Sequence, residues 1–346
     1  MSFAVINDST EYTGLGRYAS DLASAMNAKL FSLNLDSSVD PSVYPGIVAS
    51  FKPFLKIGTG WYMNHRLPSI FLSGIRNQIE KEIDPDTIIH YSSQGIPHLN
   101  LKNRYVFTVH DLFGMDSKFN RDSGLRKFLE INLKYISSGE SVITVSQHIK
   151  SQLQNFGING KIDVIYPPVS RSFKFLDNRI SLRKSLGLPE DKKLVLSVSS
   201  QDPRKNLKVV ADTMRYLGVE YNLVRVGKPI GNCYSFSNIN DEKLNEIYNA
   251  CDVLLFPSLD EGFGYPLAEA MTVGLPVVAS DIPVFHEIAE NSAILIEPDP
   301  EKLARGIKDA VDNSDILHDR GIQISKRYSF DRFKEEVNHF YKQIVV

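Results

Sequence analysis

Two glutamates, Glu261 and Glu269, lie eight positions apart in the stretch EGFGYPLAEAM. The apolar run before them, DVLLFPS, predicts a strand, and Pro266 suits the start of a helix because it has no N–H to leave unpaired. Glu261 then lies in a loop and Glu269 in the first helical turn, where free N–H groups attract anions. Carboxylates also accept hydrogen bonds from sugar hydroxyls. The pair therefore favours a sugar-diphosphate site, although a capping Glu269 and a solvated Glu261 explain it equally well.

Cations and a histidine follow other apolar runs. Arg204 and Lys205 come after LVLSVSS, and His110 lies at the end of the run in TVHDLFG. Two adjacent cations could neutralise a departing diphosphate, where negative charge develops during group transfer. By residue type alone, a solvated turn explains the two cations, and a packed or capping role explains His110.

The segment TGLGRYA contains a variant of the dinucleotide-binding fingerprint. Gly14, Gly16 and Ala19 have the spacing GxGxxA, and Asp36 follows Gly16 by twenty residues. The fingerprint normally comes directly after its strand, whereas a polar segment separates these glycines from the preceding apolar run. An NAD-dependent oxidoreductase is therefore the weaker interpretation, and a glycine-rich helix start is the plainer one.

Apolar runs alternate with segments of helical period along the whole chain. Runs without polar alternation predict strands buried on both faces, as in a parallel sheet covered by helices. The expected strands are 3–7, 29–35, 87–93, 105–111, 141–146, 161–169, 194–200, 222–227, 252–258, 276–281 and 293–298. The fold is predicted to be α/β, with two Rossmann-like, doubly wound domains facing across a cleft. We expect domains at 1–169 and 170–328, and a final helix at 329–346 that packs back on the first domain.

Composition and charge are typical of a globular protein and do not favour a nucleic-acid-binding or membrane-spanning one. The chain has 346 residues, of which 42% are hydrophobic and 23% charged, as is ordinary for a globular protein of about two domains. Its net charge of −2 gives no overall field to attract nucleic acid. The N-terminus lacks the pattern of a signal peptide, and no apolar run of about 18 residues predicts a transmembrane helix. We therefore expect a cytoplasmic protein without a nucleic-acid partner, peripheral at the inner membrane face if it meets a membrane.

The stretch FPSLDEGFGYPLAEAMTVGLPVVASDIPVFHE resembles the signature of family 4 glycosyltransferases, which have the GT-B fold, and is similar to group 1 mannosyl- and glucosyltransferases. The resemblance covers most of the chain and implies an acceptor-side first domain and a nucleotide-sugar-binding second domain. It implies that Glu261 binds the donor sugar, that Glu269 binds the ribose hydroxyls, and that the intervening backbone amides contact sugar and phosphate. The donor-binding residues that it implies are Gly14, Gly16, Gly227, Lys228, Gly262, Phe263, Gly264, Tyr265, Leu267 and Glu269.

The same resemblance implies a set of catalytic residues, namely His110, Arg204, Lys205 and Glu261. Lys205 falls at the family's lysine position for the diphosphate, and His110 is expected to reach the donor sugar from the first domain. Many members have an arginine where Ser200 stands, so Arg204 is expected to take its place.

Two further patterns concern metals and membranes. Asp84 and Asp86 have the DxD spacing of metal-dependent glycosyltransferases, but their place between an expected helix and a strand favours a turn. We expect neither a metal nor a cofactor. Residues 51–66 mix aromatic side chains with cations, which suits a membrane interface or a lipid-linked acceptor. Core packing under a long loop explains that stretch equally well.

The expected function follows from the resemblance. It is transfer of a hexosyl group from a nucleotide-diphosphate sugar to a glycan or lipid-linked acceptor, with retention of configuration and without a metal. The PRKN loop favours a mannosyl donor and a cell-surface glycan. A non-catalytic nucleotide-sugar-binding subunit remains an alternative, as does the NAD-dependent oxidoreductase.

Overall fold

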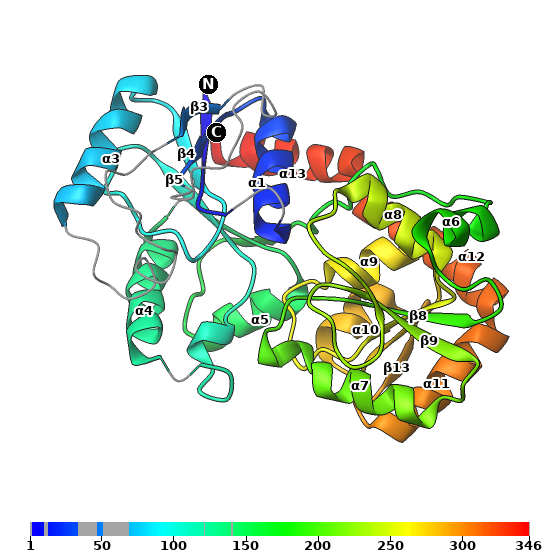
Figure 1. Cartoon of the computed structure of the whole chain (residues 1–346). Coiled ribbons are helices and arrows are strands. Elements are labelled where there is room, and N and C mark those ends of the chain that lie inside the picture. The colour runs from blue at the N-terminus through cyan, green and yellow to red at the C-terminus, as the bar shows by residue number, and fades with distance from the viewer. Residues whose placement is uncertain are drawn as a thin grey trace. The chain divides into compact units, whose positions relative to one another are not determined.

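The computed structural model describes residues 2–9, 13–33, 47–50, 69–120, 122–139 and 141–345 (Figure 1). They form two compact units, one of Met1–Pro168 with Asp331–Val346 and one of Val169–Phe330. The chain thus passes into the second unit beside the boundary expected near 169, and its last segment returns to the first unit. Asp36 and the whole stretch 51–66, for which a membrane role was one expectation, lie outside the described residues.

The first unit is built on a seven-stranded parallel sheet in the order β3-β2-β1-β4-β5-β6-β7. Its strands are β1 (Phe3–Asn7), β2 (Lys29–Ser32), β3 (Ile47–Ser50), β4 (Ile88–Tyr91), β5 (Tyr105–Val109), β6 (Ser141–Thr144) and β7 (Ile162–Val164). Its helices are α1 (Gly14–Met26), α3 (Ser69–Glu82), α4 (Ser123–Ser138), α5 (Gln147–Asn155) and α13 (Phe330–Val345), with the short η1 (Phe113–Met115). Successive residues of β1 are fully buried, as expected for a strand with helices on both faces.

The second unit repeats this plan with six parallel strands in the order β10-β9-β8-β11-β12-β13. Its strands are β8 (Lys193–Val198), β9 (Tyr221–Val226), β10 (Tyr234–Phe236), β11 (Val253–Phe256), β12 (Val277–Ser280) and β13 (Ile294–Ile296). Its helices are α6 (Arg179–Leu186), α7 (Leu207–Tyr216), α8 (Asp241–Ala250), α9 (Tyr265–Thr272), α10 (Pro283–Ala289), α11 (Pro300–Asp312) and α12 (Ser314–Ser325), with η2 (Pro203–Lys205) and η3 (Lys326–Tyr328). The core packs Val195 and Leu255 of the sheet against Leu303 and Ile307 of α11.

Both sheets confirm the predicted Rossmann-like, doubly wound fold. In each sheet the strand order reverses once, between β1 and β4 in the first unit and between β8 and β11 in the second. Chain connections leave such neighbouring strands towards opposite faces, so a crevice opens beyond their carboxyl ends, and ligands bind there in folds of this kind. Strand β10 was not predicted, because a three-residue edge strand with exposed side chains leaves no apolar run in the sequence.

A buried polar network ties helix α13 into the first unit. The ring of His90 contacts the Tyr341 hydroxyl through Nδ1 and the Thr108 hydroxyl through Nε2, the latter at 2.7 Å. Tyr18 of α1 shares a hydrogen bond of 2.8 Å with the same threonine. In Figure 1 the red α13 runs beside the blue α1, and the rings of Tyr18 and Phe333 meet edge to face at 5.7 Å. The two ends of the chain are therefore held in one unit by hydrogen bonds that have no access to water.

We expect the free energy of unfolding to fall as the pH drops below about 6.5, the pKa of an unperturbed histidine. Burial lowers the pKa of His90 to about 3 and that of His110 to about 4. Between those values and 6.5 the unfolded chain binds protons that the folded chain does not, so stability is complete above 6.5 and is lost on acidification. At pH 5 the loss should be about 2 kcal/mol for each histidine relative to pH 7, measured by urea denaturation across pH.

The control for this prediction is His90→Gln, which cannot titrate. Its unfolding free energy should depend less steeply on pH between 5 and 6.5 than that of the wild type, whatever its absolute stability. An unchanged slope would show that His90 does not stay neutral in the folded protein.

Candidate active site

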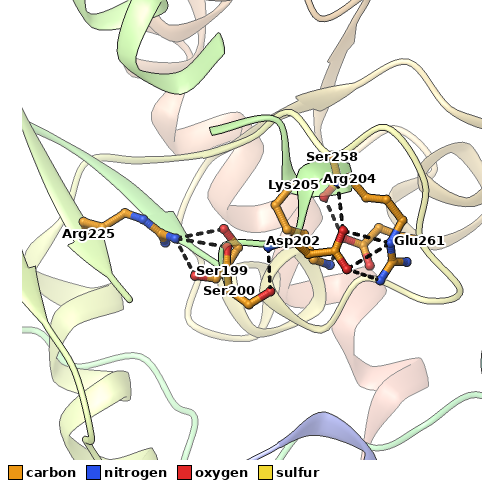
Figure 2. A network of polar contacts seen from close by, with 8 residues as sticks. All are labelled: Ser199, Ser200, Asp202, Arg204, Lys205, Arg225, Ser258 and Glu261. Atoms are coloured by element: carbon orange, nitrogen blue, oxygen red, sulfur yellow. Dashed lines mark hydrogen bonds and ion pairs between the residues drawn. The ribbon is translucent and has the colours of Figure 1, made fainter. Parts of the chain in front are cut away.

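Glu261 lies in the loop between β11 and α9, and it is 9% exposed. Its Oε1 accepts a hydrogen bond from the Ser258 hydroxyl at 2.7 Å and one from the Lys205 ammonium at 2.5 Å (Figure 2). Lys205 ends η2, which follows β8, so the pair joins the carboxyl ends of the two strands where the sheet order reverses. A solvated Glu261 is therefore excluded, and two of the predicted catalytic residues are in direct contact.

Glu269 lies in helix α9 and is 2% exposed. The expectation that it occupies the first turn is wrong, because the helix already begins at Tyr265. Gly264 is the N-cap with φ of +95°, and a Cβ there would stand 2.8 Å from the Phe285 ring, so the cap requires glycine. Glu269 thus cannot cap the helix. The Tyr248 hydroxyl donates to its Oε2 at 2.8 Å and holds the carboxylate inside the unit.

Arg204 pairs within its own loop. Its Nη2 donates to Asp202 Oδ2 at 2.9 Å, and its Nε donates to Oδ1 at 3.2 Å. Burial alone would raise the pKa of Asp202, but the hydrogen bonds from Arg204 outweigh it and lower that pKa below its ordinary value. The structure therefore places Arg204 beside Lys205, in the predicted loop, with its charge balanced by Asp202.

The remaining donor-binding residues of the second unit also lie at strand ends. Gly227 directly follows β9 with φ of +127°, and a Cβ there would approach the Ser199 carbonyl oxygen to 2.5 Å. Lys228 is exposed next to it. Gly262, Phe263, Tyr265 and Leu267 belong to the loop and first turn of α9 together with Gly264. These predicted residues are thus gathered around the ends of β8, β9 and β11.

Sequence reasoning missed Arg225, the penultimate residue of β9, which is 0% exposed. Figure 2 shows its guanidinium directed at Ser199 and Ser200, in the loop that leads to Lys205. The available signal was an arginine inside the apolar run NLVRVG, because an isolated charge is costly to bury without hydrogen-bond partners.

In the first unit, His110 comes directly after β5 and is 7% exposed. Its Nε2 contacts the carbonyl oxygen of Ser92 at 2.8 Å. A carbonyl can only accept, so Nε2 carries the proton and Nδ1 is the acceptor of the neutral ring. With the pKa lowered by burial to about 4, the ring is uncharged near neutral pH.

Gly14 and Gly16 open helix α1, whose N-cap Thr13 accepts a hydrogen bond from the Gly16 N–H at 3.1 Å. This is the geometry of a capped, glycine-rich helix start. Strand β1 ends at Asn7, so the helix does not begin directly after the strand as the dinucleotide fingerprint requires.

The described residues bear on metal binding and on membrane crossing. Asp84 and Asp86 are exposed in a turn before β4, as the sequence favoured. No group of three or more histidine, cysteine, aspartate or glutamate side chains suited to a metal was found in that part of the chain. Nor does it contain a helix with the length and apolar character needed to cross a membrane.

Two family models match the chain in succession. The model described as Glycosyltransferase Family 4 matches residues 12–173, and the model described as Glycosyl transferases group 1 matches residues 178–327. The first falls mainly on the first unit and the second falls within the other, so the matches follow the division of the structure.

Relatives of known sequence include two bacterial mannosyltransferases. The O-antigen chain mannosyltransferase RfbU of Salmonella typhimurium is 29% identical over 263 residues, which is 69% of each chain. The O-antigen chain mannosyltransferase B of Escherichia coli is 23% identical over 289 residues, which is 74% of each chain.

Solved structures share the fold over almost the whole chain. Sucrose-phosphate synthase from Thermosynechococcus elongatus aligns with a TM-score of 0.79 at 18% identity, covering 99% of both chains. Anabaena HepE, solved in complex with UDP and glucose, also aligns with a TM-score of 0.79, at 16% identity, over 99% of this chain and 100% of that one. These likenesses confirm the predicted GT-B fold.

Breaking the Lys205–Glu261 pair should destabilise the second unit measurably. The two side chains are only 17% and 11% exposed, so Lys205→Met leaves a shielded carboxylate without its cation. We expect a loss of about 1–3 kcal/mol in the free energy of unfolding, and a smaller loss for Lys205→Met combined with Glu261→Gln than the two single losses predict when added.

The matched control is Lys208→Met. Lys208 pairs with Asp212 at 2.6 Å but is 87% exposed, so its loss should cost less than about 0.5 kcal/mol. Urea denaturation of the variants measures both effects. Equal losses for Lys205→Met and Lys208→Met would mean that the shielded pair contributes no more than a surface pair.

Proposed function

The chain belongs to the group 1 and family 4 glycosyltransferases, and on that premise we propose that it transfers a hexosyl group from a nucleotide-diphosphate sugar to a glycan or lipid-linked acceptor, with retention of configuration. The observation that carries the proposal is the Lys205–Glu261 contact at the reversal point of the second sheet, close along the chain to the buried Glu269. The Lys205 cation, the Glu261 anion and the glycine-containing loop before α9 thus lie together at the place where a sheet of this kind binds ligands.

The donor would be held by complementary groups of the second unit. Lys205 and the N–H groups at the start of α9 suit the diphosphate, since both present positive charge to an anion. Glu269 would accept hydrogen bonds from the ribose, and Glu261 from the sugar. Before the donor binds, Glu261 balances the Lys205 ammonium. The arriving diphosphate would take over that ammonium and free the carboxylate for sugar hydroxyls.

Transfer would proceed on the face of the sugar from which the diphosphate leaves. The bond between the anomeric carbon and the phosphate oxygen breaks, a bond from that carbon to the acceptor oxygen forms, and the acceptor's proton passes to the leaving diphosphate. Lys205, with Arg204 beside it, would stabilise the charge that develops on the diphosphate. In this scheme the protein supplies neither a nucleophile nor a metal. His110 would accept a hydrogen bond from the donor sugar at Nδ1.

The relatives support a mannosyl donor and a surface polysaccharide as product, because both are O-antigen chain mannosyltransferases. The complex of HepE with UDP and glucose supports a nucleoside-diphosphate donor. Transfer of sugars to such a glycan would suit a cytoplasmic protein that associates peripherally with the membrane.

Binding of a nucleoside diphosphate is the first expected result. The wild type is heated with UDP, GDP, dTDP, ADP or NADH, and one diphosphate at 100 times its dissociation constant should add about 2.7 kcal/mol of stability. Glu269→Ala should lose most of that gain, because it removes the ribose contact, whereas Glu335→Ala, an exposed residue of α13, should keep it. Stabilisation by NADH alone would instead favour the oxidoreductase.

Lys205→Ala should lower turnover about a hundredfold, because loss of one preorganised charge contact in the transition state costs on the order of 3 kcal/mol. The measurement is release of the nucleoside diphosphate from its mannose conjugate, made with the diphosphate that stabilises the wild type, and Lys208→Ala is the control that keeps its activity. Turnover at the wild-type rate in Lys205→Ala would remove that residue from the mechanism. A wild type that binds the donor without releasing product would be the non-catalytic subunit.

A further inference from the structure

Arg225 is the largest fully buried side chain among the described residues. Its Nη1 donates to the carbonyl oxygens of Ser197 at 3.0 Å and Val226 at 2.6 Å. Its Nη2 donates to the Ser199 carbonyl, to the Ser199 hydroxyl at 3.1 Å and to the Ser200 carbonyl at 3.5 Å. Both terminal nitrogens of the guanidinium are therefore committed to the ends of β8 and β9 and to the first residues of the loop that follows β8.

These contacts fix which way the loop presents its N–H groups. In a trans peptide the carbonyl and the next N–H point in opposite directions. Because Arg225 draws the carbonyls of Ser199 and Ser200 inward, the N–H groups of Ser200 and Gln201 must point away from the guanidinium. Both residues are exposed. The outer side of the loop is thus lined with donors, which is what an anion needs.

The same contacts leave the loop with a surplus of positive charge. Arg204 is balanced by Asp202, and Lys205 by Glu261. In the part of the chain that the structure describes, the partners of Arg225 are carbonyl and hydroxyl oxygens, not carboxylates. Arginine stays protonated near neutral pH even when buried. The buried charge therefore acts on the outer side of the loop without being cancelled.

Gly227 makes this arrangement sterically feasible. A Cβ at that position would lie 2.5 Å from the Ser199 carbonyl oxygen and 3.0 Å from Arg225 Nη2. A side chain would thus push apart the two groups whose contact orients the loop. Glycine is required here for the sake of Arg225 as well as for its φ of +127°.

We propose that Arg225 is the positioning residue of the loop 199–205, which we call the diphosphate loop. Its buried guanidinium turns the N–H groups of Ser200 and Gln201 towards the donor's phosphates. It also supplies a positive charge that no carboxylate of the described residues neutralises, unlike the charges of Arg204 and Lys205. The inference rests on the proposed function, since it assigns the phosphates of that donor to this loop. Arg225 does not touch the donor and acts through the main chain of Ser199 and Ser200.

The test compares two ligands that differ only in their phosphates. Calorimetry measures the affinity of the nucleoside diphosphate that binds the wild type and of the nucleoside with the same base. Arg225→Met should weaken diphosphate binding about tenfold or more and leave nucleoside binding unchanged, because only phosphates meet the loop. Arg225→Lys should recover part of the loss, since a single ammonium keeps the charge but cannot hold all the carbonyls.

The control is Arg183→Met. Arg183 is also buried, and it donates to the carbonyl oxygens of Ala250 and Lys192 at 2.8 and 3.0 Å and to the Asp252 carboxylate at 2.7 Å. Its loss should lower stability without changing the ratio of the two affinities. If Arg225→Met does not fold, Arg225→Lys decides by the same ratio.

Each outcome has one meaning. Diphosphate affinity that stays at the wild-type value in the Arg225 variants, or that falls in step with nucleoside affinity, overturns the inference and leaves the proposed function standing. A wild type that binds no nucleoside diphosphate overturns the proposed function, and the inference with it. A selective loss of diphosphate affinity supports both.

Discussion

Parallel pairing of β8 with β11 is the constraint on which the site depends. The register matches Val195 with Val253 and Leu196 with Leu254, so both strands end at the same level of the sheet. Their connections leave for different neighbours, β9 on one side and β12 on the other, and the two loops meet in a hydrogen bond from the Leu259 N–H to the Arg204 carbonyl at 2.8 Å. Residues carried by the two loops can therefore meet in front of the sheet, and Lys205 and Glu261 do so although 56 positions separate them.

Around that meeting point, charge is arranged so that an anion is favoured before any ligand arrives. Two cations are held by carboxylates, which keeps them in place at little cost in side-chain entropy when the ligand binds. Arg225 instead donates its hydrogen bonds to main-chain carbonyls and to the Ser199 hydroxyl at the start of the same loop. The paired cations can exchange partners, whereas the buried one cannot move. In the proposed transfer, a preorganised positive environment of this kind would favour the state in which the leaving diphosphate gains charge.

The first unit uses buried polar groups differently. His90, Thr108, Tyr18 and Tyr341 satisfy one another where water is absent, and both histidines of the region are neutral near pH 7. Such a network stabilises only when every member is paired. The network fixes helix α13, the last helix of the chain, against the sheet of the first unit, which contains the first strand, β1.

The sequence alone predicted every strand except β3 and β10, together with the doubly wound plan and the family, because buried parallel strands need continuous apolar runs and the spacing of Glu261 and Glu269 is local. It did not determine the edge strand β10, which is too short and too exposed to leave an apolar run. Nor did it place Glu269 in the right turn, since Gly264 and not Tyr265 became the cap. The partners of Lys205, Glu269 and Arg225 were decided only by tertiary structure, at separations of 56, 21 and 26 positions. The ion-pair partner of each charged residue depends on which strand ends the fold brings together. The sequence pattern of a single segment therefore cannot predict it.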